Sequence, residues 1–325
     1  MYKLTKVDRI LVMELLNNSR TSIKEISKKF GISRSSISNR IKILEEKGIL
    51  SGYNVDFNPT FVGIFPVGIL IKTKKIPEIN EIKEITKDIP NIYRCSLCAG
   101  PFNIQIRMYI HKLEEMQKIM EKFNQTLEIE DFEYLINTER TFFLRDFLGL
   151  GLKINQVYGP FHYGLKLDMK CNRTELKILT LLTQNCRLSM SAIAKIIKKP
   201  LSTVNFCFKK LKEKKVIEKF STFINVTKFG YSIDHIKIRV KESNEIIDKK
   251  IFKFCRDSDE IFIYNKTFGK WNYNLQLFVK SAEETYLLVK QLQKEVPEID
   301  KLDVFRIYAG YSHAVDFNKL VKGLS

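Results

Sequence analysis

The sequence predicts an α+β fold that consists of two copies of one unit, each with a small helical head followed by a βαββαβ domain. The first observation behind this prediction is a duplication, because the 325-residue chain matches itself at an offset of 167 residues. The second is that the spacing of apolar residues changes within each copy from about 3.6 to 2. The gapless pairs include Leu15 with Leu182, Leu44 with Leu211, Asn58 with Asn225 and Gly63 with Gly230.

The duplication sets the expected domain boundaries. Helical heads are predicted at residues 1–62 and 169–229, and βαββαβ domains at 63–143 and 230–325. Residues 144–168 contain four glycines and show no helical period, so we interpret them as a linker between the copies.

Composition limits the class of function. Hydrophobic residues make up 44% and charged residues 28%, as expected for a folded globular protein, and the net charge of +18 favours a polyanionic partner. Nucleic acid is the first expectation and an anionic membrane the second. No apolar run is long enough to span a bilayer and the N-terminus lacks the apolar core of a signal peptide, so we expect a cytoplasmic protein without a membrane partner. The six scattered cysteines are expected to be reduced thiols.

The first head has three predicted helices. Thr5 with Asp8 and Ser22 with Glu25 have the spacing of capping boxes, which mark two helix starts. A third helix is predicted from Ser33 to about Lys47, with Gly48 just beyond its end. Its apolar residues Ile37, Ile41 and Leu44 share one stripe, so the opposite face is polar and basic.

Two helices joined by a short turn are typical of a helix-turn-helix, which places its second helix in the major groove. The polar and basic face of the predicted third helix suits that position. Arg can recognise guanine and Asn adenine, whereas Ser and Lys suit phosphate. A solvated amphipathic helix without DNA is the alternative interpretation. The side chains predicted to contact double-stranded DNA from this head are Ser22, Arg34, Ser35, Ser36, Ser38, Asn39, Arg40 and Lys42.

The second head is more basic but has fewer base-reading groups. Leu201 stands at the position equivalent to Arg34, and Phe206 at the position equivalent to Asn39. We therefore expect the second head to bind phosphate or to pack against a protein through Phe206, unless Phe206 is simply buried. Its predicted DNA contacts are Lys198, Lys199, Ser202, Thr203, Asn205, Lys209 and Lys210.

After each head the apolar pattern predicts β-α-β-β-α-β, the ferredoxin-like arrangement. In the first copy the strands are expected near residues 69–71, 93–99, 103–110 and 132–138, and in the second near 236–238, 261–267, 273–279 and 302–309. Helices are expected to cover one face of each sheet. The other face is free to pair with the second copy, so we expect a pseudo-dimer within one chain.

These residues resemble a known family. The series Asp8-Arg9-Ile10, Asn18-Ser19-Arg20, 26–31, 40–49 and Gly52-Tyr53 is similar to the Lrp/AsnC (feast/famine) transcriptional regulators, and the resemblance extends over both copies. It implies dimerisation through the ferredoxin-like sheets, possible higher oligomers, and an amino-acid effector near the loops with Gly100, Asn103, Gly269 and Asn272. Both asparagines stand where the family commonly has Asp, which argues against amino-acid sensing. The tandem layout is similar to archaeal two-copy members.

From these features we expect a sequence-specific DNA-binding transcriptional regulator that is not an enzyme and uses no cofactor or metal. Two alternatives remain open. The run Trp271-Asn272-Tyr273-Asn274-Leu275 is similar to one in siroheme decarboxylases, which share the double-headed layout, but the preceding strand at 261–266 lacks the histidine of those enzymes. The other alternative is a small-molecule sensor or assembly module that does not bind DNA.

The expectation of no metal comes from the cysteines and histidines. Cys95 and Cys98 have metal spacing but no second pair nearby, and the four histidines form no ligand pair.

Overall fold

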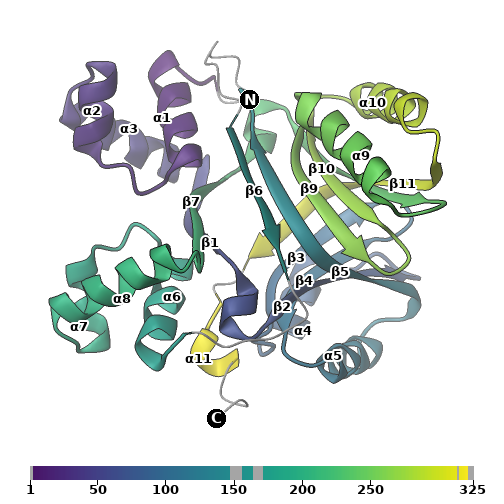
Figure 1. Cartoon of the computed structure of the whole chain (residues 1–325), viewed down its shortest axis with the longest axis horizontal. Coiled ribbons are helices and arrows are strands. Elements are labelled where there is room, and N and C mark those ends of the chain that lie inside the picture. The colour runs from purple at the N-terminus through teal and green to yellow at the C-terminus, as the bar shows by residue number, and fades with distance from the viewer. Residues whose placement is uncertain (1–2, 147–155, 164–170, 313–314, 321–325) are drawn as a thin grey trace.

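The two heads lie side by side at one end of the molecule and a β-barrel occupies the other (Figure 1). This is a computed structural model that describes residues 3–146, 156–163, 171–312 and 315–320. Within these residues, no helix has both the length and the apolar character needed to cross a bilayer.

The first head contains α1 (Lys6–Asn17), α2 (Ile23–Phe30) and α3 (Arg34–Glu46). Both predicted capping boxes are confirmed, with Thr5 and Asp8 at the start of α1 and Ser22 and Glu25 at the start of α2. Gly31 ends α2 in the left-handed conformation at a φ of 66°, which a residue without Cβ adopts at little cost. Ile37, Ile41 and Leu44 are buried in the core of the head, as their spacing predicts.

The second head repeats this arrangement with α6 (Arg173–Gln184), α7 (Met190–Ile197) and α8 (Leu201–Glu213). The duplication pairs Gly31 with Lys198, which ends α7 in the same left-handed conformation at a φ of 54°. This conformation is unfavourable for a residue with a Cβ atom. The second head therefore keeps the fold of the first although its turn has lost the glycine.

Each head continues into a wing strand, and the two wings pair with one another. Strand β1 (Leu50–Phe57) is antiparallel to β7 (Ile217–Ile224), with Tyr53 opposite Thr222. Val55 and Phe57 pack into the core of the second head, whereas Ile224 packs against the first. The two heads are thus joined by an exchange of wings.

The two ferredoxin-like domains have the predicted order. The first contains β2 (Phe65–Thr73), α4 (Ile79–Thr86), β3 (Ile92–Ala99), β4 (Ile104–Ile110), α5 (Glu114–Asn124) and β5 (Ile129–Leu144). The second contains β8 (Ser232–Val240), α9 (Glu245–Asp257), β9 (Ile261–Phe268), β10 (Tyr273–Val279), α10 (Ala282–Glu295) and β11 (Ile299–Ser312), and α11 (Phe317–Leu320) follows it. The predicted α+β fold of two repeats is confirmed.

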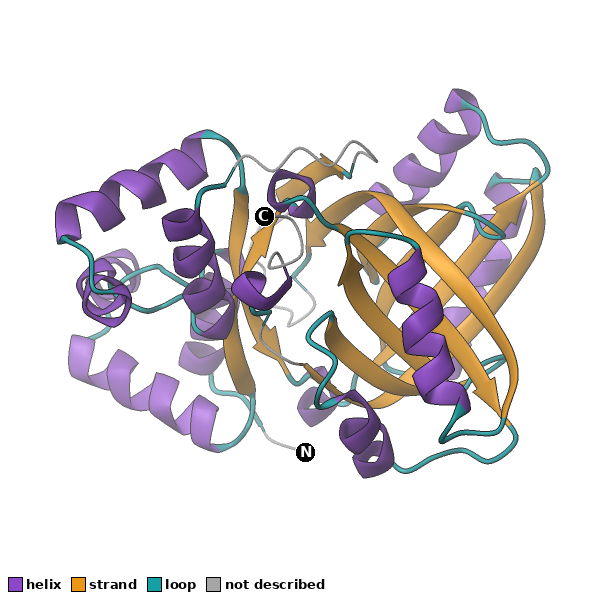
Figure 2. Ribbon diagram, turned by 90° about the horizontal axis from the view of Figure 1, so that it is seen from below, coloured by secondary structure: helices purple, strands orange, loops and turns teal. Residues whose placement is uncertain are grey.

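The two sheets join at both edges. Strand β3 pairs with β11 and β5 pairs with β9, both antiparallel, within a nine-stranded sheet. Because β5 also pairs with β2, the strands close into a barrel, which Figure 2 shows from below. The predicted pseudo-dimer therefore forms through shared strand edges.

Helices cover the outer face of the barrel and leave its interior to side chains from both repeats. Helices α4 and α5 pack on the first repeat and α9 and α10 on the second. The interior cluster contains Leu70, Cys98, Phe102, Leu135, Trp271, Phe305 and Ile307. All six cysteines are free and buried.

The predicted linker at 144–168 contains a strand. Within it, β6 (Gln156–His162) pairs antiparallel with β5, so Arg140 lies opposite Phe161. Residues 147–155 and 164–168 of this segment lie outside the described residues. The absence of a helical period therefore did not exclude a strand, because a short strand with mixed residues has no strong pattern.

Candidate DNA-binding heads and a cationic cavity

The outward face of α3 has the character that the sequence predicts. Arg34, Ser35, Ser36, Ser38, Asn39 and Lys42 are all exposed. Ser33 caps the helix with a hydrogen bond from the Ser36 amide, so the chain enters α3 with its first turn ordered. Ser22 is exposed, but its side chain is engaged in capping α2.

Arg40 is partly committed inside the head. Its guanidinium lies 3.3 Å from the buried Asp8 carboxylate and donates a hydrogen bond to Thr5 at 3.0 Å. The second head has a similar pair, because Lys210 lies 3.7 Å from the buried Glu175, although the residue that corresponds to Arg40 is Cys207. Each of these cations joins the third helix of its head to the first, a role that the sequence interpretation did not assign.

The equivalent face of α8 is less polar. Lys198, Lys199, Ser202, Asn205 and Lys209 are exposed and Thr203 is partly exposed. Phe206 is 66% exposed and Leu201 is 47% exposed. Burial of Phe206, one of the two interpretations of this residue, is therefore wrong.

The loops predicted to bind an effector are occupied by contacts within the chain. Asn103 accepts a hydrogen bond from the Thr73 amide and donates one to the Thr73 carbonyl, and Asn272 accepts one from the Val240 amide. A Cβ atom on Gly100 would lie 2.9 Å from Phe305, and Gly269 has a φ of 123°. Both loops lie away from the cavity described below, and effector binding there stays a prediction.

The barrel interior near these loops holds a buried charge network. Lys237 is fully buried, with its ammonium 3.0 Å from Glu133 and 3.5 Å from Asp303. The Trp271 indole donates to Glu133 at 2.6 Å, and its ring lies 4.3 Å from the Lys237 ammonium. Trp271 is thus a core aromatic residue, and it also helps to hold the charge pair.

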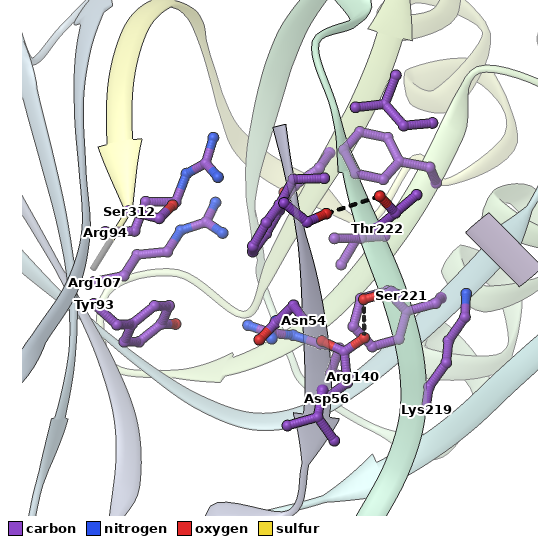
Figure 3. A pocket seen from close by; sticks show the side chains of 18 of the residues that line it. Asn54, Asp56, Tyr93, Arg94, Arg107, Arg140, Lys219, Ser221, Thr222 and Ser312 are labelled. Atoms are coloured by element: carbon purple, nitrogen blue, oxygen red, sulfur yellow. Dashed lines mark hydrogen bonds between the residues drawn. The ribbon is translucent and has the colours of Figure 1, made fainter. Parts of the chain in front are cut away.

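A cavity of about 450 Å³ lies between the paired wings and the barrel. Strands β1 and β7 line it on the side of the heads, and strands from both repeats line it on the side of the barrel. Figure 3 shows the polar side chains that surround it. Its aromatic lining includes two stacked pairs, Tyr93 with Tyr109 at 4.5 Å and Phe262 with Phe278 at 3.8 Å between ring centres.

The cavity carries an excess of positive charge. Arg94, Arg107 and Arg140 line it from β3, β4 and β5, and Lys219 from β7. Among the described residues, none of these four cations forms an ion pair with a carboxylate. Burial, reinforced by the positive charges of Arg94 and Arg140, lowers the pKa of Arg107 to about 9. A buried cation without a counter-ion is costly, so this arrangement suits an anion.

His235 on β8 lines the cavity. One ring nitrogen is 3.5 Å from the Arg107 guanidinium, the other is 3.3 Å from the Asn274 side chain, and the ring stacks on Phe305. Burial and the positive charge of Arg107 hold its pKa well below the usual range, so the imidazole is neutral at neutral pH. A neutral ring can accept from Arg107 while it donates to Asn274, which orients the guanidinium.

Two carboxyl groups face the cavity from the wings. Asp56 on β1 accepts a hydrogen bond from Ser221 at 2.8 Å. Burial and the charge of Asp56 raise the pKa of Glu218 on β7 to about 9, so Glu218 is protonated at neutral pH. The cavity therefore keeps its positive excess at neutral pH.

Sequence reasoning did not find this cavity. Arg94 and Arg107 each interrupt an apolar strand, which is a usable signal, since a buried strand rarely carries an unpaired charge. His235 was interpreted as an ordinary polar residue because it has no partner at ligand spacing. Its neighbours Arg107 and Asn274 come from other strands.

Fold and site together define a two-headed winged helix-turn-helix protein. A family model described as "Winged helix-turn-helix DNA-binding" matches residues 4–51 and 172–218, one match in each head. The HTH-type transcriptional regulator LrpA of Pyrococcus horikoshii is 31% identical over 113 residues, which cover 35% of this chain and 80% of LrpA. The regulatory protein AsnC of Escherichia coli is 27% identical over 145 residues, 42% of this chain and 90% of AsnC. The chain belongs to the Lrp/AsnC family, with two family units in tandem.

Solved structures of a siroheme decarboxylase share the whole architecture. The siroheme decarboxylase NirDL in complex with an iron-uroporphyrin III analogue aligns with a TM-score of 0.61 over 99% of this chain and 100% of that chain, at 14% identity. At this identity the likeness shows the fold alone. The expectation that the chain is not an enzyme is nevertheless wrong where it rests on the architecture. The same two-repeat fold belongs to an enzyme, NirDL.

Proposed function

We propose that the chain is a sequence-specific DNA-binding transcriptional regulator that reads bases mainly with α3 and binds phosphate with the second head. The observation that carries this proposal is the difference between the two third helices. Exposed Arg34 and Asn39 on α3 can form paired hydrogen bonds with guanine and adenine. Leu201 and Phe206 at the equivalent positions of α8 cannot, whereas exposed Lys199 and Lys209 beside them can contact phosphate.

Replacing Arg34 and Asn39 together by alanine is expected to lower affinity for the preferred site far more than for random duplex. Each lost base contact costs about 1 to 3 kcal/mol of discrimination, so losing two should lower the ratio of specific to random affinity at least about thirtyfold. Selection from genomic fragments supplies the preferred site, and fluorescence anisotropy measures both affinities. Equal losses on both duplexes would contradict the assignment of α3 as the reading helix.

Replacing Lys199 and Lys209 by alanine provides the comparison for the second head. This variant should weaken both duplexes alike and reduce the salt dependence of binding by about two released ions. Lys118→Ala with Lys290→Ala removes the same charge from exposed helices of the barrel and serves as the matched control. If the Lys199/Lys209 variant and the Lys118/Lys290 control show the same salt dependence, the second head does not contact DNA and this part of the proposal is wrong.

A second candidate function is an enzyme that acts on a tetrapyrrole carboxylic acid. The cavity favours it, because its lining includes several aromatic rings and an excess of cations, as a compound with several carboxylates requires. The NirDL complex shows that this architecture can hold such a compound.

Titration with an iron-uroporphyrin III analogue tests the second candidate. We expect a saturable change in its visible absorption at one equivalent per chain, because transfer into an aromatic cavity changes the surroundings of the macrocycle. The absence of a spectral change at high protein concentration would exclude this candidate and leave the DNA-binding proposal intact.

A further inference from the structure

Arg94 and Arg107 are directly opposite one another on neighbouring strands. They form a cross-strand pair between β3 and β4, and both guanidinium groups point side by side into the cavity (Figure 3). Like charges in such a pair repel and reduce the stability of a sheet. Among the described residues no carboxylate pairs with either group, so the folded chain does not relieve this repulsion.

The residues around the pair leave hydrogen-bonding capacity unused. Gln105, two positions before Arg107 on β4, is 2% exposed, and its Oε1 atom has no hydrogen-bond partner. Ser312 on β11 lies opposite Arg94 and lines the cavity beside it. This unpaired amide oxygen accepts and does not donate, so it indicates a bound molecule that also carries a donor, such as a hydroxyl or a protonated carboxyl group.

We infer that Arg94 and Arg107 form a clamp for carboxylate, and that the cavity binds planar compounds carrying two or more carboxylates. The guanidinium fork matches a carboxylate through two parallel hydrogen bonds. Arg140 offers a further cation for a second carboxylate. The stacked rings of Tyr93 with Tyr109 and of Phe262 with Phe278 favour a flat body. This inference rests on the second candidate function in one respect, because both concern the same cavity. It does not require that the bound compound is a tetrapyrrole.

Calorimetric titration with benzene polycarboxylates tests the clamp on the full chain. Pyromellitate, which carries four carboxylates on one ring, is expected to bind with one site per chain, and benzoate, which carries one, at least about tenfold more weakly. Arg94→Gln with Arg107→Gln should weaken pyromellitate binding at least about tenfold. Lys118→Gln with Lys290→Gln removes the same charge from the surface and should leave the affinity unchanged.

The clamp variant is expected to fold, because glutamine removes two half-buried like charges that have no carboxylate partner among the described residues and leaves no carboxylate behind. A melting temperature equal to or above that of the parent verifies this. Pyromellitate affinity that is the same in the clamp variant and the parent would overturn the inference, as would benzoate binding as tightly as pyromellitate. Tighter binding of pyrophosphate would make this a phosphate site and would also overturn it. Pyromellitate binding without a response to the porphyrin would keep the clamp and exclude the second candidate function.

Discussion

Glu133→Leu is expected to lower the free energy of unfolding by about 3 to 5 kcal/mol, because it leaves the ammonium of Lys237 buried with a weaker partner. Lys237 is fully buried, and Glu133 is its nearest carboxylate at 3.0 Å, whereas Asp303 lies at 3.5 Å. The substitution also removes the acceptor of the Trp271 indole. Urea unfolding followed by Trp271 fluorescence measures the loss.

The double variant Glu133→Leu with Lys237→Met separates a lost contact from an orphaned charge. Replacing both members of a buried ion pair by apolar residues of similar size is often neutral, so this variant should recover most of the stability. Asp303 then keeps a contact with the exposed Lys301 at 4.0 Å. A double variant as unstable as Glu133→Leu would show that the loss comes from packing around Trp271 and not from the charge.

Glu218→Gln is expected to flatten the dependence of stability on pH. Burial and the charge of Asp56 raise the pKa of Glu218 to about 9 in the folded chain, whereas an exposed glutamate titrates near 4.5. Between these values the folded state holds one proton more than the unfolded state. The contribution of Glu218 to the free energy of unfolding is therefore fully present below about pH 4.5, and it is lost as pH rises through the folded pKa.

The size of this effect makes it measurable. The parent should lose of the order of 2 to 4 kcal/mol between pH 5 and pH 8 through Glu218, and the glutamine variant should not. Arg140 and Asp56 are the charged groups that act on Glu218 across the cavity, and both remain in the variant. Urea unfolding at both pH values measures the difference, with Glu213→Gln on the exposed face of α8 as control. The same pH dependence in parent and variant would contradict the buried, protonated state of Glu218.

Local patterns in the sequence were sufficient for the heads. The capping boxes at Thr5 and Ser22, the turn at Gly31 and the stripe of Ile37, Ile41 and Leu44 each depend on residues within a few positions of one another. The exposed face of α3 follows from the same periodicity. The duplication then extended the prediction to the second head, although Lys198 and Phe206 depart from the first.

The cavity depends on contacts that no local pattern encodes. Arg94 and Arg107 belong to strands whose alternation shows two faces but does not show which face lies inside a barrel. That choice is made when β3 pairs with β11, between residues 207 to 218 positions apart, and β5 pairs with β9, between residues 121 to 132 positions apart. The same closure brings His235 to Arg107 and Glu133 to Lys237.

The sequence by itself determined the two tandem units, the order of their helices and strands, and the different surfaces of α3 and α8. Each of these follows from interactions between residues close along the chain or from comparison of one copy with the other. Only the tertiary structure decided that the wings exchange between heads, that the sheets close into a barrel, and that unpaired cations meet beneath the wings. Strand-edge pairing and burial of charge arise between distant segments, so their outcome exists only once the chain has folded.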